Sequence, residues 1–207
     1  MADLTKAIQF VLEQEDSRLS GIITETPHDL GGTTRFGLTE RWHPALIPTG
    51  FFGPTMNNGV DVPTMSVDDA LALARKTYAS DYGEALLLAD LNADAHAAGL
   101  LSFAVVGGNL TAIKVFQQAI ADVTPSLGAD FVDGHMGPGT IKSANAVDAE
   151  LLLQAFVNRQ KEHFQSICDN DPTQDCFLHG WTNRADALLT YQVPAPDGAA
   201  ANGSVVA

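Results

Sequence analysis

The sequence predicts a mostly α-helical protein. Three observations support this fold class. Apolar residues recur at steps of three and four in six or more segments, polar capping residues precede several of these segments, and Gly- or Pro-rich breaks separate them. The chain has 207 residues, of which 45% are hydrophobic, so it can bury a core as one domain or as two small ones packed together.

Residues 2–15 form the first expected helix. One face of it carries Leu4, Ile8 and Val11. The next position on that face is Glu15, whereas Glu13 falls on the opposite, solvent-facing side. A carboxyl group at the end of a core-facing stripe is partly desolvated, which disfavours its charged form and lets it hold a proton, as a general acid must. The alternative is that the helix ends earlier and leaves an ordinary solvated carboxylate.

Residues 16–65 show no sustained periodicity and are rich in Gly, Pro, Thr and Asn. We therefore expect a long irregular region, with a short hairpin near residues 19–26. Aromatic side chains within it indicate an ordered structure: Phe36, Trp42, Phe51 and Phe52.

A second helix is expected after Ser66, which is a favourable capping residue. Its inner face carries Val67, Leu71, Ala74 and Tyr78. Residues 84–106 are nearly uncharged and rich in Ala and Leu, and HAAGLLSFAVV within them, at residues 96–106, predicts a buried central helix. Gly107, Gly108 and Asn109 end it.

Three further helical segments complete the prediction. One places Ile113, Phe116 and Ile120 on a single face, and we assign Phe103 and Phe116 to the core. The Gly/Pro-rich turn at residues 132–140 leads into a short helix. Asp148 caps a long helix with Leu152, Phe156 and Phe164 on its stripe, the cysteine loop interrupts it, and residues 181–191 close the fold.

Composition excludes several classes of function. The formal net charge is −14 and basic residues do not cluster, which argues against nucleic-acid binding. No apolar run approaches the roughly 20 residues of a membrane span. The histidines lack metal-site spacing, so we expect no metal or other cofactor. Cys168 and Cys176 either form a disulfide or remain free thiols, depending on the compartment.

Residues 29–44 are unusually rich in functional side chains for a loop. Gly31 and Gly32 permit positive φ angles or close approach of a ligand. Thr34 adds a hydroxyl, Arg35 a fixed cation and Asp29 a second carboxylate. Alone, this pattern favours a structural turn whose hydroxyls bond to its own backbone.

An acid at the end of the first helix, followed by DLGGTTRFGLT at residues 29–39, resembles the signature of glycoside hydrolase family 108. These proteins are lysozyme-like N-acetylmuramidases found in phage endolysins and bacterial secretion-activator proteins. The sequence departs from the family where Asp16, Ser17 and Arg18 replace a Gly-Gly-Tyr motif, and where extra residues precede the glycine pair. These departures leave Glu13 as an alternative to Glu15.

Three later motifs resemble the second half of the same family, a predicted peptidoglycan-binding region. They are FQQA at residues 116–119, VDGHMGPGT at residues 132–140 and FLHGWTNR at residues 177–184. The resemblance implies a lysozyme-like catalytic region over residues 1–95 and a helical peptidoglycan-binding-like region over residues 96–191 packed on it. Residues 192–207, rich in Pro, Ala, Gly and Ser, are expected to be a disordered tail.

The resemblance implies hydrolysis of the β-1,4 bond between N-acetylmuramic acid and N-acetylglucosamine in peptidoglycan glycan strands. Glu15 would be the acid, Asp29 the second carboxylate and Thr34 a water-holding hydroxyl. Arg35 either binds a substrate carboxylate or braces the loop. Tyr78 and Tyr82, one helical turn apart, either face a sugar cleft or belong to the core. Trp181 is expected to be a core anchor.

Two other functional classes remain open. A non-catalytic wall-binding protein of the same fold would explain the altered sequence after Glu15. A chitinase- or chitosanase-type glycosidase would suit the acidic charge, because chitosan is cationic. We expect a monomer that reaches the cell wall or periplasm without a cleaved signal peptide, since the N-terminus lacks a basic region and a long apolar stretch.

Overall fold

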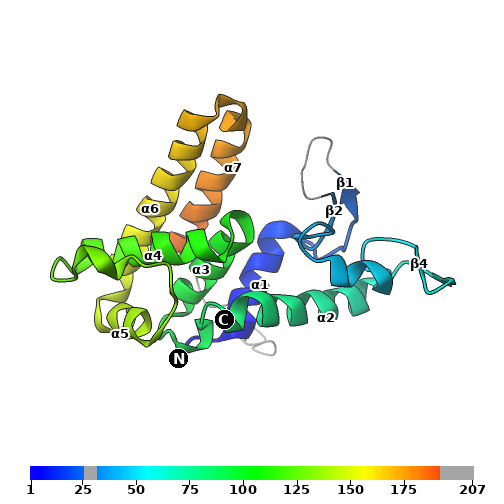
Figure 1. The fold of residues 1–207 in the computed structure, drawn as a ribbon, viewed down its shortest axis with the longest axis horizontal. Coiled ribbons are helices and arrows are strands. Elements are labelled where there is room, and N and C mark those ends of the chain that lie inside the picture. The colour runs from blue at the N-terminus through cyan, green and yellow to red at the C-terminus, as the bar shows by residue number, and fades with distance from the viewer. Residues whose placement is uncertain (26–31, 192–207) are drawn as a thin grey trace, which may run out of the picture.

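The computed structural model describes residues 1–25 and 32–191, and its architecture confirms the mostly α-helical prediction. The α-helices are α1 (Leu4–Glu15), α2 (Val67–Tyr78), α3 (Asp94–Gly107), α4 (Asn109–Val123), α5 (Pro138–Ala146), α6 (Ala149–Asn170) and α7 (Asp175–Asp186). Figure 1 shows α6 and α7 side by side, rising from the rest of the molecule, with α2 and the short strands on one side of them and α5 on the other. The expected tail at residues 192–207 lies outside the described residues.

The core forms around α3, which is apolar on every side. Residues 96–104 of this helix are all buried, and the helix packs against α1, α4 and α6. The ring of Phe156 in α6 meets the rings of Phe103 and Phe116 edge-on, with centroids 6.3 and 5.0 Å away. Phe103 and Phe116 are therefore core residues, as predicted. A helix buried all round holds the elements on both sides of it in place.

Helix ends follow local chemistry where a capping side chain is present. Asp3 caps α1 by accepting hydrogen bonds from the N–H groups of Thr5 and Lys6, so the helix starts at Leu4. Ser66 and Asp148 cap α2 and α6, as predicted. The central helix contains the expected residues 96–106 and begins two residues before them, at Asp94. Before it, residues Ala79–Glu84 continue α2 as a π-helical turn, and Leu87 adopts a positive φ of 49° that keeps this turn separate from α3.

The strands lie between α1 and α2. β1 (Thr24–Glu25), β2 (Thr33–Arg35) and β3 (Leu38–Thr39) form an antiparallel sheet in that order, and β4 (Thr55–Asn57) pairs with β5 (Val60–Val62). One strand of the hairpin expected near residues 19–26 is β1, but its partner is β2, further along the chain than expected. In this pairing Thr24 lies opposite Thr34, ten residues further along the chain.

The two cysteines lie in different helices. The long helix continues through Cys168 to Asn170, so the break comes at residues 171–174 rather than at the first cysteine, and Cys176 lies in α7. Both thiols are free in this structure. Within residues 1–25 and 32–191, none of the helices combines the length and the apolar character that a membrane crossing requires.

Candidate active site

Glu15 is the last residue of α1. Its neighbours Val11 and Leu12 are fully buried, and its side chain is only 20% exposed. Asp16 then leaves the helix in an extended conformation, with its N–H still bonded to the carbonyl of Leu12. Glu13 is exposed and accepts a hydrogen bond from Gln9 at 2.6 Å, so of the two acids only Glu15 occupies the buried end of the helix.

Glu15 lines an open cavity of about 440 Å³ between the end of α1 and the three-stranded sheet. The other lining residues are Asp16, Ser17, Ser20, Ile22, Thr24, Thr34, Phe36 and Gly37. Thr34 therefore shares a cavity with Glu15, and its hydroxyl donates a weak 3.4 Å hydrogen bond to the carbonyl of Gly32. Asp29 lies outside the described residues, so its relation to Glu15 stays a prediction.

The backbone at Gly37 approaches Glu15 more closely than any other residue type would allow. Its φ is +77°, and a Cβ atom placed there would collide with the Glu15 side chain and would lie 2.6 Å from the hydroxyl of Tyr78. Glycine is therefore required both by conformation and by space. The turn between β2 and β3 forms one wall against the acid.

Tyr78 packs against the turn between β2 and β3 and holds it in place. The side chain is fully buried, and its hydroxyl donates a 2.8 Å hydrogen bond to the carbonyl of Phe36. Burial, reinforced by the negative charge of Glu15, raises the pKa of Tyr78 well above its usual value, so it stays a neutral donor. Tyr78 thus takes the core position that was one of its two predicted roles, and it does not face a sugar cleft.

Arg35 braces the loop instead of facing the cavity. Its side chain is 3% exposed, and its guanidinium donates to three backbone carbonyls, those of Gly21, Phe51 and Met65, at 2.9–3.1 Å. Burial lowers the pKa of Arg35, but a guanidinium remains charged in proteins. The structure thus agrees with the bracing alternative, and Arg35 leaves the set of candidate substrate-binding residues.

Asp16 organises the chain immediately after the acid. Its carboxylate accepts hydrogen bonds from the Ser20 hydroxyl and from the N–H groups of Arg18 and Gly21, at 2.7–3.2 Å. Desolvation pushes the pKa of Asp16 upward, but these hydrogen bonds outweigh it and lower the pKa below the usual value of 3.8. Asp16 is therefore a structural residue of the turn.

Arg184, which the sequence did not single out as a site residue, contacts the acid directly. Its Nη2 atom lies 2.6 Å from Oε1 of Glu15, and its side chain is only 17% exposed. Among the described residues Nη2 makes no well-directed hydrogen bond. Because these two oppositely charged atoms are so close, the contact is an ion pair although it lacks hydrogen-bond geometry. Arg184 is the last residue of the FLHGWTNR motif in α7, 169 positions after Glu15 in the sequence.

A polar chain holds Arg184 in position. Its Nε donates to the Ser102 hydroxyl at 2.8 Å, and that hydroxyl donates to Oε1 of Gln14 at 2.7 Å. The Gln14 amide reaches back to the Arg184 carbonyl at 3.4 Å. Side chains from α1 and α3 thereby hold the arginine of α7 beside the acid.

The other two C-terminal motifs meet each other away from the acid. Gln117, which is 1% exposed, accepts a 2.8 Å hydrogen bond from the Gly134 N–H and donates to Asp133 and to Thr140. Gly134 has a φ of +78°, and a Cβ atom there would lie 2.7 Å from Leu110. FQQA and VDGHMGPGT therefore form one structural unit that connects α4 to α5.

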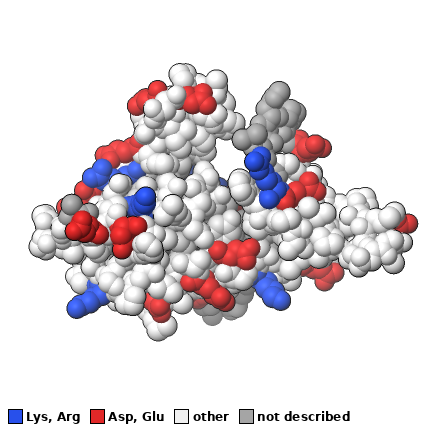
Figure 2. Space-filling view, viewed as in Figure 1, with Lys and Arg blue, Asp and Glu red and all other residues white. Residues whose placement is uncertain are grey.

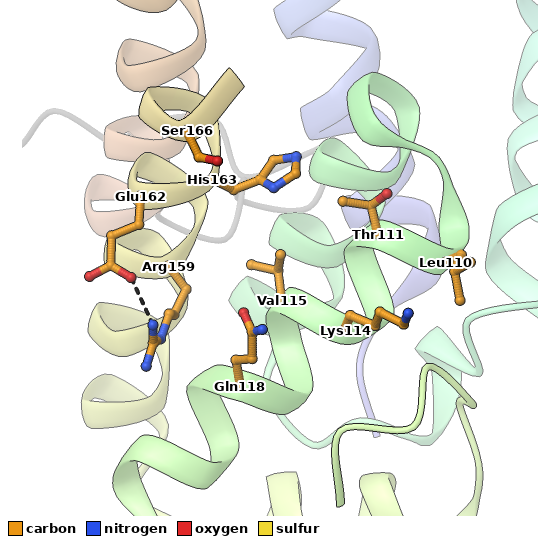
Figure 3. Close-up of a pocket in the computed structure, with 9 residues that line it drawn as sticks. All are labelled: Leu110, Thr111, Lys114, Val115, Gln118, Arg159, Glu162, His163 and Ser166. Atoms are coloured by element: carbon orange, nitrogen blue, oxygen red, sulfur yellow. Dashed lines mark hydrogen bonds and ion pairs between the residues drawn. The ribbon is translucent and has the colours of Figure 1, made fainter. Parts of the chain in front are cut away.

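A second cavity, of about 390 Å³, lies between α4 and α6 (Figure 3). Lys114 and Gln118 come from α4, whereas Arg159 and His163 come from α6. The Arg159 guanidinium is paired with Asp122 and Glu162, and burial lowers the pKa of His163. No charge cluster points to a metal site here, since the described residues contain no group of three or more His, Cys, Asp or Glu side chains suited to bind one.

Comparison with known proteins bears on the C-terminal region. Residues 111–186, from α4 to the end of α7, match a family described as a predicted peptidoglycan domain. This segment includes Arg184. Peptidoglycan is therefore the partner that the sequence match supports.

The whole fold also has a solved counterpart. The chain is similar to the structure of Brucella abortus SagA, with 19% identity over 90% of this chain and 91% of that one, at a TM-score of 0.61. At this identity the likeness shows a shared fold. No curated protein matches the chain.

Proposed function

We propose that the protein cleaves the glycan strands of peptidoglycan as an N-acetylmuramidase, with Glu15 as the general acid. The observation that carries the proposal is the position of Glu15. It is a partly buried carboxyl group at the edge of an open cavity, and it contacts an arginine from the segment that matches a peptidoglycan domain. Figure 2 shows a hollow between the part of the molecule with α6 and α7 and the part with the strands.

The reaction needs two functions from the protein. Glu15, when protonated, would donate its proton to the leaving glycosidic oxygen of the β-1,4 bond. A second group must then activate water or stabilise the positive charge that develops on the sugar. Thr34, on the same cavity, is our candidate for holding the water, and Asp29 is our candidate for the second carboxylate.

Arg184 would act as a positioning residue for Glu15. After proton transfer the acid becomes a carboxylate, and the adjacent guanidinium stabilises that product. On its other side, the Glu15 side chain packs closely against Gly37, beside the hydroxyl of Tyr78. Glu15 is thus packed on one side and paired on the other, so its carboxyl group is held in one position at the edge of the cavity.

The two proposed regions, residues 1–95 and 96–191, would then act together. The second supplies Arg184 to an acid carried by the first, and Tyr191 packs its ring against Phe10 of α1 with centroids 4.9 Å apart. We propose accordingly that the helical region presents cell-wall glycan to the acid, and that the protein works at the cell wall.

The test compares two glutamates on one helix. Purified wild-type protein, Glu15→Gln and Glu13→Gln are incubated with peptidoglycan, and new reducing ends are counted. Loss of a general acid removes about 10²- to 10⁴-fold of rate, so Glu15→Gln should be nearly inactive. Glu13 is exposed and lies on the same helix, so Glu13→Gln should retain wild-type activity.

Three results would contradict the proposal. If wild-type protein releases no sugar ends from any peptidoglycan but sediments with cell walls, the non-catalytic binding function replaces it. Cleavage of chitosan in preference to peptidoglycan would favour a chitosanase. Equal activity in wild type and Glu15→Gln would place the acid elsewhere. Mass spectrometry of the products separates hydrolysis, which adds water, from a transglycosylase reaction, which leaves anhydro ends.

A further inference from the structure

A cavity of about 480 Å³ lies where the π-helical turn meets the junction of α3 and α4. It is lined by Trp42, Asp81, Tyr82, Ala104, Val105, Val106, Gly107, Gly108 and Asn109. The lining combines two aromatic side chains, an apolar floor and a few polar groups. That is the usual composition of a small-ligand site.

Trp42 presents its indole to solvent at the edge of this cavity. The residue is 70% exposed, and the Arg41 guanidinium lies 5.3 Å from the ring centroid. Trp42 follows β3, so the sheet that walls Glu15 also carries this side chain. A flat, amphipathic ring fixed at a cavity mouth is suited to stack against the apolar face of a sugar.

Tyr82 connects this cavity to the acid. Its ring centroid lies 5.8 Å from that of Tyr78, whose hydroxyl packs beside Gly37 and Glu15. Burial, with the charges of Asp81 and Glu15, raises the pKa of Tyr82 to about 12, so its hydroxyl remains protonated. Its proximity to Tyr78 places the cavity next to the acid.

The floor suits an acetamido group. Val105 and Val106 give an apolar surface for a methyl group, and Val106 is 38% exposed. The N–H group of Asn109, the first residue of α4, has no partner within the helix and suits a carbonyl oxygen. The Asn109 amide donates to the Asp81 carbonyl at 3.2 Å, which fixes the two sides of the cavity together.

The charge of the lining selects between the two sugars of the wall. Asp81 is the formally charged residue among those that line the cavity, and it is exposed. Its carboxylate disfavours the lactyl carboxylate of N-acetylmuramic acid, whereas N-acetylglucosamine carries no charge.

We propose that this cavity is a subsite for an N-acetylglucosamine residue of the glycan, with Trp42 stacking on the sugar ring. The inference rests on the proposed function, because the glycan that occupies the subsite is the one whose bond is cut at Glu15. It adds that recognition depends on residues 42, 81–82 and 104–109.

The chain offers a direct optical test, because it contains two tryptophans. In a Glu15→Gln, Trp181→Phe variant, Trp42 is the remaining indole. Phe at position 181 keeps an aromatic ring between Phe164 and Phe177, whose centroids lie 5.2 and 5.6 Å from that of Trp181. Titration with soluble N-acetylglucosamine oligomers should change the Trp42 emission saturably, and glucosamine oligomers should have a weaker effect.

Calorimetry on single variants measures affinity without relying on the Trp181 substitution. Trp42→Ala should weaken binding of the N-acetylglucosamine oligomers by about tenfold, the scale of one well-placed aromatic contact. Met56→Ala is the matched control, because Met56 is also apolar and exposed (68%) but lies on β4 outside this cavity. Its affinity should equal that of wild type.

The outcomes separate this inference from the proposed function. Trp42-dependent binding in a protein that never cleaves peptidoglycan would leave the subsite standing and remove the catalytic role of Glu15. Equal affinity in Trp42→Ala and wild type, no binding of the oligomers at all, or tighter binding of glucosamine oligomers would each overturn the subsite. In all three cases cleavage that depends on Glu15 could still be observed.

Discussion

The ion pair between Glu15 and Arg184 leads to a quantitative prediction for the free energy of unfolding. We consider Arg184→Met, Glu15→Gln and the double variant. Arg184 contacts Glu15 at 2.6 Å and Ser102 at 2.8 Å, and both charged side chains are at least four-fifths buried. Removing the arginine leaves the carboxylate desolvated without its cation, and removing the carboxylate leaves the guanidinium in the same position.

The magnitude follows from these two contacts. Hydrogen bonds and contacts to charged groups contribute about 1.5–3 kcal/mol each, but the residual exposure lets water replace part of this. We therefore expect Arg184→Met to lower the free energy of unfolding by about 2–3 kcal/mol, since the Ser102 contact is also lost. For a chain of this size that corresponds to a decrease in Tm of about 4–12 °C. In the double variant the losses should not add, with a coupling energy of about 1–2 kcal/mol.

Urea unfolding followed by circular dichroism gives the four free energies of the cycle. Arg159→Met provides the matched control, because Arg159 is paired with Asp122 and Glu162 and shares no partner with Glu15. Its effect should add to that of Glu15→Gln within about 0.5 kcal/mol. If Arg184→Met and Glu15→Gln are also additive within this limit, the ion pair contributes nothing to folding and our account of the site is wrong.

Two further predictions concern the turns around the acid. Gly37→Ala should lower stability by more than Gly59→Ala does; both positions have φ near +80°, costing about 1–2 kcal/mol for alanine, but a Cβ collides with Glu15 only at position 37. Equal decreases in Tm for the two variants would show that the Glu15 side chain moves away from the added Cβ atom at no cost in stability. Asp16→Asn should destabilise the protein at neutral pH, because the folded-state pKa of Asp16 is lowered and its carboxylate stabilises the fold above the unfolded value of 3.8. The difference between this variant and wild type should shrink as the pH falls below about 4, and a constant difference across the pH range would contradict it.

Helices were predictable from the sequence because their determinants are local. Capping at Ser66 and Asp148 depends on a side chain and a backbone N–H group three residues apart. The β4–β5 hairpin was missed although its signal is also local, since Asn58-Gly59 adopts positive φ at both positions, the requirement of a tight hairpin turn. Leu87, by contrast, is not a residue type that favours a positive φ, so the turn that separates α2 from α3 has no local signal in the sequence.

The site was predictable only in part because its key contacts are not local. The buried stripe of α1 indicates Glu15, and the glycine-rich loop indicates Thr34. The role of Arg35 depends on carbonyls from three separate segments, at Gly21, Phe51 and Met65, which no periodicity brings together. The role of Arg184 could not be predicted for the same reason. Its motif was recognisable, but its partner Glu15 lies at the other end of the chain.

This long-range contact bears on how the two proposed regions work. A boundary between residues 95 and 96 falls inside α3, whose residues 96–104 are buried against elements from both sides. Separating the chain there would expose that apolar surface and would also remove Arg184 from Glu15. A module that only tethers an enzyme to its polymer does not need to enter the enzyme's site. Here the segment that matches a peptidoglycan domain ends two residues after the arginine that contacts the acid, so glycan binding by that segment and the position of the Glu15 side chain would be physically linked.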